Sequence, residues 1–243
     1  VTGVFGAYTS NETAAAGVGH MNSFRDDHIR FTGLAALADV NSTFYLFDRP
    51  FKFNIKGVIA YQETRIRFGD SKWFWGIGLS YLDASSAFRL ELEDEVPPSV
   101  IDVIDLFRSD VTNSGLSAKL AWDTRDNTSL PNSGQFIDLA LWRYDDIFGS
   151  DSDYWDARFK LLSFHQLHEK FVLGARFEYS AIDGNAPFFA IPWVTLRGIP
   201  AMRYQGDAVG VIEVEGRYNF SPRWALIGFA GSGWVSSQKP AIG

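Results

Sequence analysis

Residues 209–220 read VGVIEVEGRYNF and alternate strictly between two kinds of side chain. One face carries Ile212, Val214, Gly216, Tyr218 and Phe220, and the other carries Val211, Glu213, Glu215, Arg217 and Asn219. A period of two is the pattern of a β-strand. A soluble sheet would turn the first face to a core and the second to water. A transmembrane barrel would turn the first face to lipid and the second to its lumen.

The same alternation recurs along the chain, and helical periodicity is nearly absent. In segment 51–62, for example, Ile59 and Tyr61 belong to an apolar face, which a barrel would turn to lipid. Eleven strands are predicted, over 1–9, 12–22, 28–46, 50–68, 72–83, 113–125, 135–145, 154–165, 170–182, 207–220 and 223–235. Most run for about 9–13 residues, longer than the strands of globular sheets and long enough to cross a bilayer at a tilt. An all-β fold, a transmembrane antiparallel barrel, is therefore favoured over a soluble sandwich or lectin-like module.

The connections between these strands alternate in length. Short ones lie near 24–27, 69–72, 167–170 and 221–222, and long ones lie at 84–112, 146–153 and 183–206. Because outer-membrane barrels have short periplasmic turns and long external loops, the alternation assigns the two ends. By parity the turn 127–134 is periplasmic. A short amphipathic helix is predicted at 98–108 in an external loop, either as a lid over the mouth or as an ordered cap.

Composition agrees with a barrel and excludes several other classes. The chain of 243 residues has 16% aromatic residues, no cysteine and a formal net charge of −7. Outer-membrane barrels use aromatic residues at both membrane interfaces, and a negative chain is a poor partner for nucleic acid. No apolar stretch is long enough for a membrane helix. One domain over 1–243 is predicted, because no linker divides the chain.

Enzymatic and metal-binding motifs are lacking. No nucleophile elbow, P-loop or dinucleotide-binding glycine motif occurs in the sequence. His165 and His168 are three residues apart, so a strand would not place both on one face. We therefore expect no enzyme activity, no cofactor and no metal.

Two separated motifs resemble a known family. They are WDTRDNTSLPNSG at 122–134 and WVTLRG at 193–198, followed by the strand that contains EGRYNF. The combination is similar to the barrel of the BamA/TamA-like outer-membrane insertase and translocator superfamily, the bacterial surface antigens. The resemblance covers about 113–235 well and the N-terminal half loosely. Because strand patterning begins at the first residue, the periplasmic repeat domains of that family are expected to be missing.

The resemblance implies a loop that folds back into the lumen, where Arg197 pairs with acidic residues of the wall. Arg197 and Gly198 keep the family pattern, whereas Leu196 and Ile199 depart from it. The implied partners are Glu215 and Glu213, because Gly231 stands where the family often has a second aspartate. The alternative is an exposed loop arginine. In the other motif, Asp123, Arg125, Asp126, Pro131 and Gly134 match a turn that structures the periplasmic rim.

Ten charged residues are predicted to face the lumen. They are Lys119, Arg143, Asp156, Arg158, Lys160, Arg176, Glu178, Glu213, Glu215 and Arg217. They could line a conducting pore, or they could cross-link a plugged lumen through ion pairs, and their mixed signs favour the second arrangement.

The function implied by the resemblance is a pore for protein assembly or transport in the bacterial outer membrane. The alternatives are a passive channel and the membrane anchor of a missing domain. The expected partners are membrane lipid or detergent and client membrane proteins. Eleven strands is an odd number for a bacterial barrel, and a further strand would start near Ala241–Gly243. An incomplete barrel is therefore expected, with open edges that could pair as a homodimer.

Overall fold

The computed structural model describes residues 1–46, 49–89 and 110–236. These residues form one antiparallel sheet of eleven strands in chain order, each paired only with its neighbours in sequence. The strands are β1 (Thr2–Tyr8), β2 (Ala14–Phe24), β3 (Ile29–Leu46), β4 (Arg49–Arg67), β5 (Trp73–Arg89), β6 (Asp110–Asp123), β7 (Gly134–Tyr144), β8 (Tyr154–His168), β9 (Phe171–Gly184), β10 (Ala208–Ser221) and β11 (Trp224–Ser236). Two short 3-10 helices, η1 (Asp146–Phe148) and η2 (Phe188–Ala190), lie in loops. In the described part of the chain no helix has the length and apolarity needed to cross a membrane.

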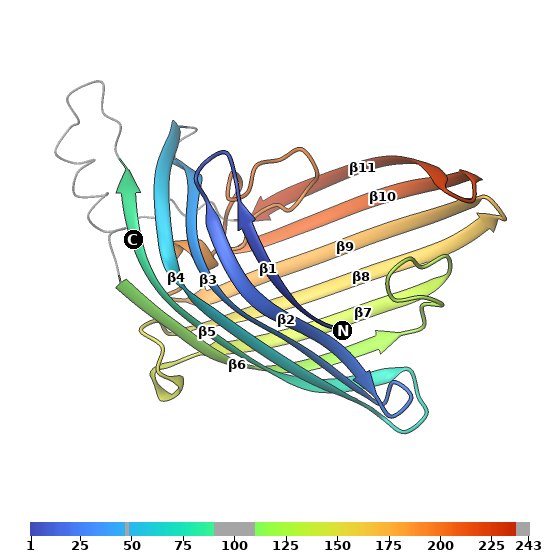
Figure 1. Ribbon diagram of the computed structural model, residues 1–243, viewed down its shortest axis with the longest axis horizontal. Helices are drawn as coiled ribbons and strands as arrows, with labels where there is room; N and C mark the ends of the chain where they lie inside the picture. The colour runs from blue at the N-terminus through green and yellow to red at the C-terminus, as the bar shows by residue number, and fades with distance from the viewer. Residues whose placement is uncertain (47–48, 90–109, 237–243) are drawn as a thin grey trace.

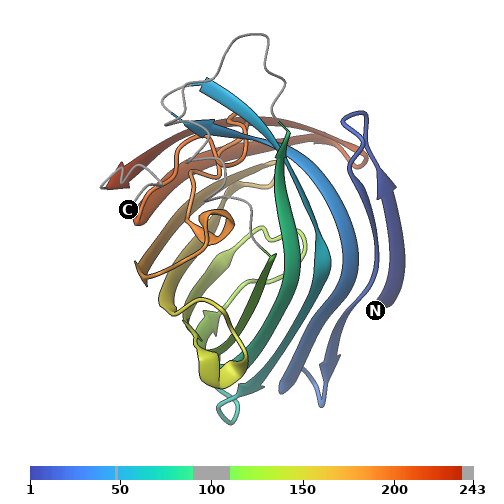
Figure 2. The same cartoon turned by 90° about the vertical axis from the view of Figure 1, so that its left-hand side faces the viewer.

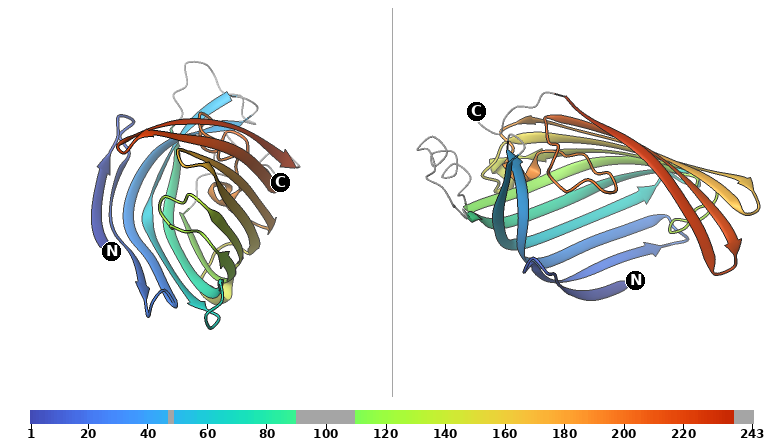
Figure 3. Two further views of the ribbon diagram at one scale, coloured as in Figure 1. Left: turned by 90° about the vertical axis from the view of Figure 1, so that its right-hand side faces the viewer. Right: turned by 90° about the horizontal axis from the view of Figure 1, so that it is seen from above.

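The sheet curls around a central lumen (Figures 1 and 2). The four short turns at 25–28, 68–72, 169–170 and 222–223 lie at one end of the strands, which we call the short-turn end. The loops 145–153 and 185–207 lie at the opposite end, the long-loop end. Within the described residues β1 and β11 each pair with one strand only, so they are the edges of an open sheet (Figure 3).

Alternation decides which side chains face outward. On β5 the large apolar residues Trp73, Trp75, Ile77, Leu79 and Tyr81 are all exposed, whereas Phe74 is fully buried on the lumen side. The same outward apolar pattern follows β10 through Ile212, Val214 and Tyr218. Trp73 packs against Trp122 of the neighbouring strand at the short-turn end, with ring centroids 6.4 Å apart. An apolar outer wall bounded by aromatic residues is the arrangement of a transmembrane barrel.

The predicted all-β barrel is therefore confirmed, and all eleven predicted strands are present with bounds that differ by a few residues. The inward loop 185–207 lies within the curve of the sheet (Figure 2). The predicted helix at 98–108 lies outside the described residues.

Two predictions about facing were wrong. On β4 Tyr61 faces the lumen, where its hydroxyl meets Lys119, and Ile59 shares that face. Polar Lys56, on the opposite face, pairs with Asp39 near the long-loop end. On β7 Arg143 lies on the outer face, with its guanidinium over the Trp155 ring, because buried Trp142 and Tyr144 occupy the lumen face on either side. On both strands each face carries polar as well as apolar residues, so polarity alone assigns the lumen and outer faces wrongly.

Candidate functional site in the barrel lumen

Arg197 lies at the centre of an ion-pair cluster inside the lumen. It belongs to the long loop between β9 and β10, and its Nη2 donates to the Glu215 carboxylate and lies 3.3 Å from Glu213 Oε1. The guanidinium also lies 4.3 Å from the centre of the Phe229 ring on β11. The next residue, Gly198, has φ +84°, a left-handed conformation that glycine adopts without strain. The structure thus brings the four residues of the predicted cluster together.

Two glycines on β11 make room for this loop. A Cβ added at Gly231 would lie 2.8 Å from Leu196 Cδ2, and one at Gly233 would lie 2.5 Å from Val194 Cγ1. Val194 is buried with Val209 and Val211 of β10. Burial of these side chains stabilises the inward position of the loop. At position 231, where the resemblance implies an aspartate, the space is filled by Leu196 instead.

The loop 124–133 between β6 and β7 is held by the predicted turn motif. Asp126 Oδ1 accepts hydrogen bonds from the backbone N–H groups of Asn132 at 2.9 Å, Ser133 at 3.2 Å and Asn127 at 3.0 Å. These hydrogen bonds, that from Asn132 foremost, lower the pKa of Asp126. Gly134 has φ +96°, and a Cβ there would lie 2.3 Å from the Thr124 carbonyl oxygen. Only glycine fits this position.

The remaining members of the motif fix the loop to the wall. Arg125 donates to both carboxylate oxygens of Asp123 at 2.9 and 3.0 Å and lies over the Phe136 ring. Pro131 is buried, and its carbonyl accepts a hydrogen bond of 3.1 Å from Arg217 on β10. Arg217 also donates to Asn132 Oδ1 at 2.5 Å.

β10 therefore contacts loops from both ends of the barrel. Glu213 and Glu215 hold the loop that enters from the long-loop end, and Arg217 holds the loop at the short-turn end. The three residues are alternate positions on one face of one strand. The contact of Arg217 with the turn motif was not predicted, because the two are 85 or more residues apart in sequence.

Ion pairs also cross the lumen between strands that are not neighbours. Arg65 of β4 makes a two-pronged contact with Asp138 of β7, at 2.7 and 3.2 Å, and also pairs with Glu63. Lys119 of β6 pairs with the same Glu63. Nearer the short-turn end Arg30 of β3 lies 2.7 Å from Asp123 of β6. The sequence reasoning missed Arg30, Glu63, Arg65 and Asp138, and correct assignment of the faces of β4 would have found Glu63 and Arg65.

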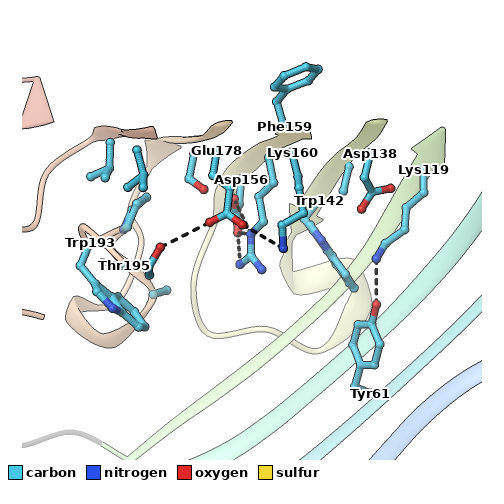
Figure 4. Close-up of a pocket in the computed structure, with 17 residues that line it drawn as sticks. Tyr61, Lys119, Asp138, Trp142, Asp156, Phe159, Lys160, Glu178, Trp193 and Thr195 are labelled. Carbon is cyan, nitrogen blue, oxygen red and sulfur yellow. Dashed lines mark hydrogen bonds and ion pairs between the residues drawn. The ribbon is translucent and has the colours of Figure 1, made fainter. Parts of the chain in front are cut away.

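A cavity of about 470 Å³ lies between the inward loop and the wall (Figure 4). Its charged lining residues are Lys119, Arg158, Lys160, Asp138, Asp156 and Glu178. Arg158 contacts Asp156 at 2.9 Å, and Lys160 contacts Glu178 at 2.9 Å. Thr195 of the inward loop lies 3.4 Å from the same Glu178. The lining is part polar and part apolar, with three positive and three negative residues. Lys119 and Asp138 pair with Glu63 and Arg65, which are outside the lining.

Among the residues that the structure describes, no three His, Asp or Glu side chains converge as metal ligands. The ion pairs of the lumen join loops to the wall and strands to one another.

Comparison with solved structures shows the same fold in an experimental protein. The crystal structure of BamA from Haemophilus ducreyi lacking POTRA domains 1–3 matches with a TM-score of 0.61 and 13% sequence identity. The match covers 96% of this chain and 52% of the BamA chain, so this chain spans about half the length of that protein. No curated protein sequence matches the chain.

Comparison with family models identifies the superfamily. The Omp85 superfamily domain matches residues 60–193, which is more than half of the chain. The matched segment includes the turn motif with Asp123, Arg125 and Gly134 and ends at Trp193, within the inward loop 185–207. The chain therefore belongs to the Omp85 superfamily.

Proposed function

We propose that this chain forms the barrel of an outer-membrane insertase or translocator, a pore for protein assembly or transport with the Arg197 loop held in its lumen. The observation that carries the proposal is the joint contact of Arg197 with Glu213 and Glu215 inside an apolar-walled barrel. A guanidinium beside two carboxylates forms charge-assisted contacts that are stronger than neutral hydrogen bonds. Such a contact can keep the loop in place inside the lumen of a transport pore.

Residence in the bacterial outer membrane is part of this proposal. It is supported by the outward apolar residues of β5 and β10 and by superfamily membership. The partners proposed with it are membrane lipid and client membrane proteins. The paired charges of the lumen support a pathway that is closed at rest, because ion pairs between loop and wall leave few free charges for passing ions.

Conductance across a planar bilayer tests the role of the loop. Arg197→Ala removes the guanidinium, so the loop should leave the lumen part of the time and the current should show frequent large openings. Arg197→Lys keeps the positive charge but replaces the guanidinium by a compact ammonium group, and we expect an intermediate opening frequency. Arg203→Ala, on the same loop, is the matched control and should conduct like the original protein.

A passive channel is the second candidate. The cavity beside the inward loop, with its charged and apolar lining, favours it, because such a space can hold water and small solutes without loop movement. A large, steady conductance that Arg197→Ala leaves unchanged would reject the gated pore and support the channel. A protein that conducts nothing in any variant would instead fit a membrane anchor for a further domain.

A further inference from the structure

Four basic side chains stand apart from the dense ion pairing of this protein. Among the arginine and lysine side chains that the structure describes, in 1–41, 52–85 and 110–236, only those of Arg25, Lys72, Lys170 and Arg223 have neither an ion pair nor a hydrogen bond. All four lie in the short turns, one in each turn. Four unpaired cations at one end of the barrel are free to contact a negatively charged partner outside the chain.

Each of these cations directly adjoins an aromatic residue on the outer wall. The neighbours in sequence are Phe24, Trp73, Phe171 and Trp224. Phe24 is 52% exposed, Trp73 43% and Trp224 70%. In antiparallel register these aromatics share the outward face with residues such as Trp75 and Leu226. The amphipathic rings of Trp73 and Trp224 are typical of the boundary between hydrocarbon and headgroups, and the apolar rings of Phe24 and Phe171 fit its hydrocarbon side.

Acidic residues accompany the cations in three of the four turns. Asp26 directly follows Arg25, Glu169 directly precedes Lys170, and Asp70 is separated from Lys72 by Ser71. Each cation lies just beyond the strand end that carries its aromatic neighbour. In a bilayer that level is occupied by lipid phosphates.

At the long-loop end of the barrel, the described side chains include no such unpaired basic residues beside outward aromatics. There Lys56 pairs with Asp39 at 2.9 Å, and Arg143 lies 2.6 Å from Asp153 and also pairs with Asp145. The loop 124–133, at the short-turn end, differs from the four short turns, since its Arg125 is paired with Asp123. Among the described side chains, unpaired cations thus occur in the short turns alone.

We propose that the four short turns bind anionic phospholipids of the leaflet at the short-turn end, with Arg25, Lys72, Lys170 and Arg223 contacting lipid phosphates. The inference rests on the proposed residence in a membrane. Basic residues at a membrane surface are attracted to anionic lipid, and neighbouring aromatics hold them at headgroup depth. The adjoining outward aromatic residues place the cations at headgroup depth, which favours lipid over an acidic protein in the surrounding water.

Electron paramagnetic resonance of spin-labelled lipids tests the proposal. The protein is reconstituted in phosphatidylcholine bilayers with spin-labelled phosphatidylglycerol or phosphatidylcholine as the probe. The fraction of probe immobilised by the protein gives its relative affinity. We expect a preference for phosphatidylglycerol of roughly twofold averaged over the lipid shell, since only four sites carry it. The preference should vanish in R25Q/K72Q/K170Q/R223Q and should weaken in high salt.

The matched control changes the acids of the same turns. D26N/D70N/E169Q should keep or increase the preference. Heat-modifiable mobility shows whether each variant is folded. Equal immobilisation of both probes by the original protein would overturn the inference and leave an acidic protein as the counterpart. A preference that survives loss of all four cations would also overturn it. No immobilised lipid of either kind would contradict membrane residence itself, so the two failures are distinguishable.

Discussion

Gly231 shows how one residue shapes the contacts of the inward loop. The resemblance implies an aspartate there, which would offer Arg197 another carboxylate. Instead Leu196 lies where a side chain at position 231 would point, and Arg197 uses Glu213 together with Glu215. Packing of an apolar side chain thus replaces one ion pair, and the loop still lies inside the lumen.

Gly231→Ala should therefore destabilise the protein. The new Cβ would crowd Leu196, and overpacking of this kind costs about 1–3 kcal/mol in the free energy of unfolding. Adding Leu196→Ala to the Gly231→Ala variant should recover most of that cost, because the effects of substitutions at contacting residues are coupled. Urea unfolding in a defined detergent measures both. Gly228→Ala, on the same strand with open space around it, is the control and should change little. Equal effects at 231 and 228 would contradict this account.

At the scale of elements, β10 joins the two inward-reaching loops. Glu213, Glu215 and Arg217 are successive lumen-facing positions, so a shift of this strand would act on both loops together. The turn motif supplies the preformed shape of its loop through Asp126 and Gly134. Arg217 supplies the attachment of that loop to the far side of the lumen.

Arg217→Ala should release the loop 124–133 without unfolding the barrel. Loss of hydrogen bonds from a charged donor favours local opening by about tenfold or more. Trypsin should then cleave after Arg125 faster, as followed by mass spectrometry of the fragments. The matched control is Arg223→Ala. It also removes one trypsin site, and Arg223 does not contact the loop. Unchanged cleavage after Arg125 would show that Arg217 does not hold the loop.

The turn between β2 and β3 should contribute a pH-dependent part of the stability. The hydrogen bond from Arg30, with help from Ser23 and the charge of Arg67, lowers the pKa of Asp27 from 3.8 to about 2 despite partial burial. A carboxyl whose pKa is lower in the folded than in the unfolded state stabilises the folded state at pH values above its unfolded pKa. This contribution is lost as the pH falls from about 4 to about 2.

Thermal unfolding between pH 2 and 6 measures this contribution. The difference in Tm between the original protein and Asp27→Asn should be constant above pH 5 and should shrink as the pH approaches 2. Asp26→Asn, one residue away and without a hydrogen bond from any described residue, should show no such convergence. A difference that is independent of pH would refute the role given to Asp27.

At the scale of the whole molecule, ion pairs across the lumen accompany the curvature of the sheet. Arg30 to Asp123 and Arg65 to Asp138 each join strands three apart, which lie close only in a curled sheet. The described sheet remains open, and neither β1 nor β11 carries a charged residue. Uncharged edges with free backbone groups favour pairing with a further strand.

We therefore predict an edge-paired homodimer in detergent, visible by native mass spectrometry. Charged residues that point inward from an edge strand oppose such pairing. Phe5→Lys combined with Ala225→Lys places lysines on the lumen face of both edges and should give monomers. Met21→Lys, on the lumen face of β2, is the control and should remain dimeric. A monomeric mass for the original protein would exclude the dimer.

The sequence by itself determined the eleven strands, most of their outward faces and the two motifs of the superfamily. These features are local, because a period of two and a turn motif are written in consecutive residues. The facing of Arg143 and Tyr61, the contact of Arg217 with the turn and the bond of Arg65 with Asp138 were decided only by the tertiary structure. Each depends on strand register and on the curvature of the sheet, which bring together residues far apart in the chain.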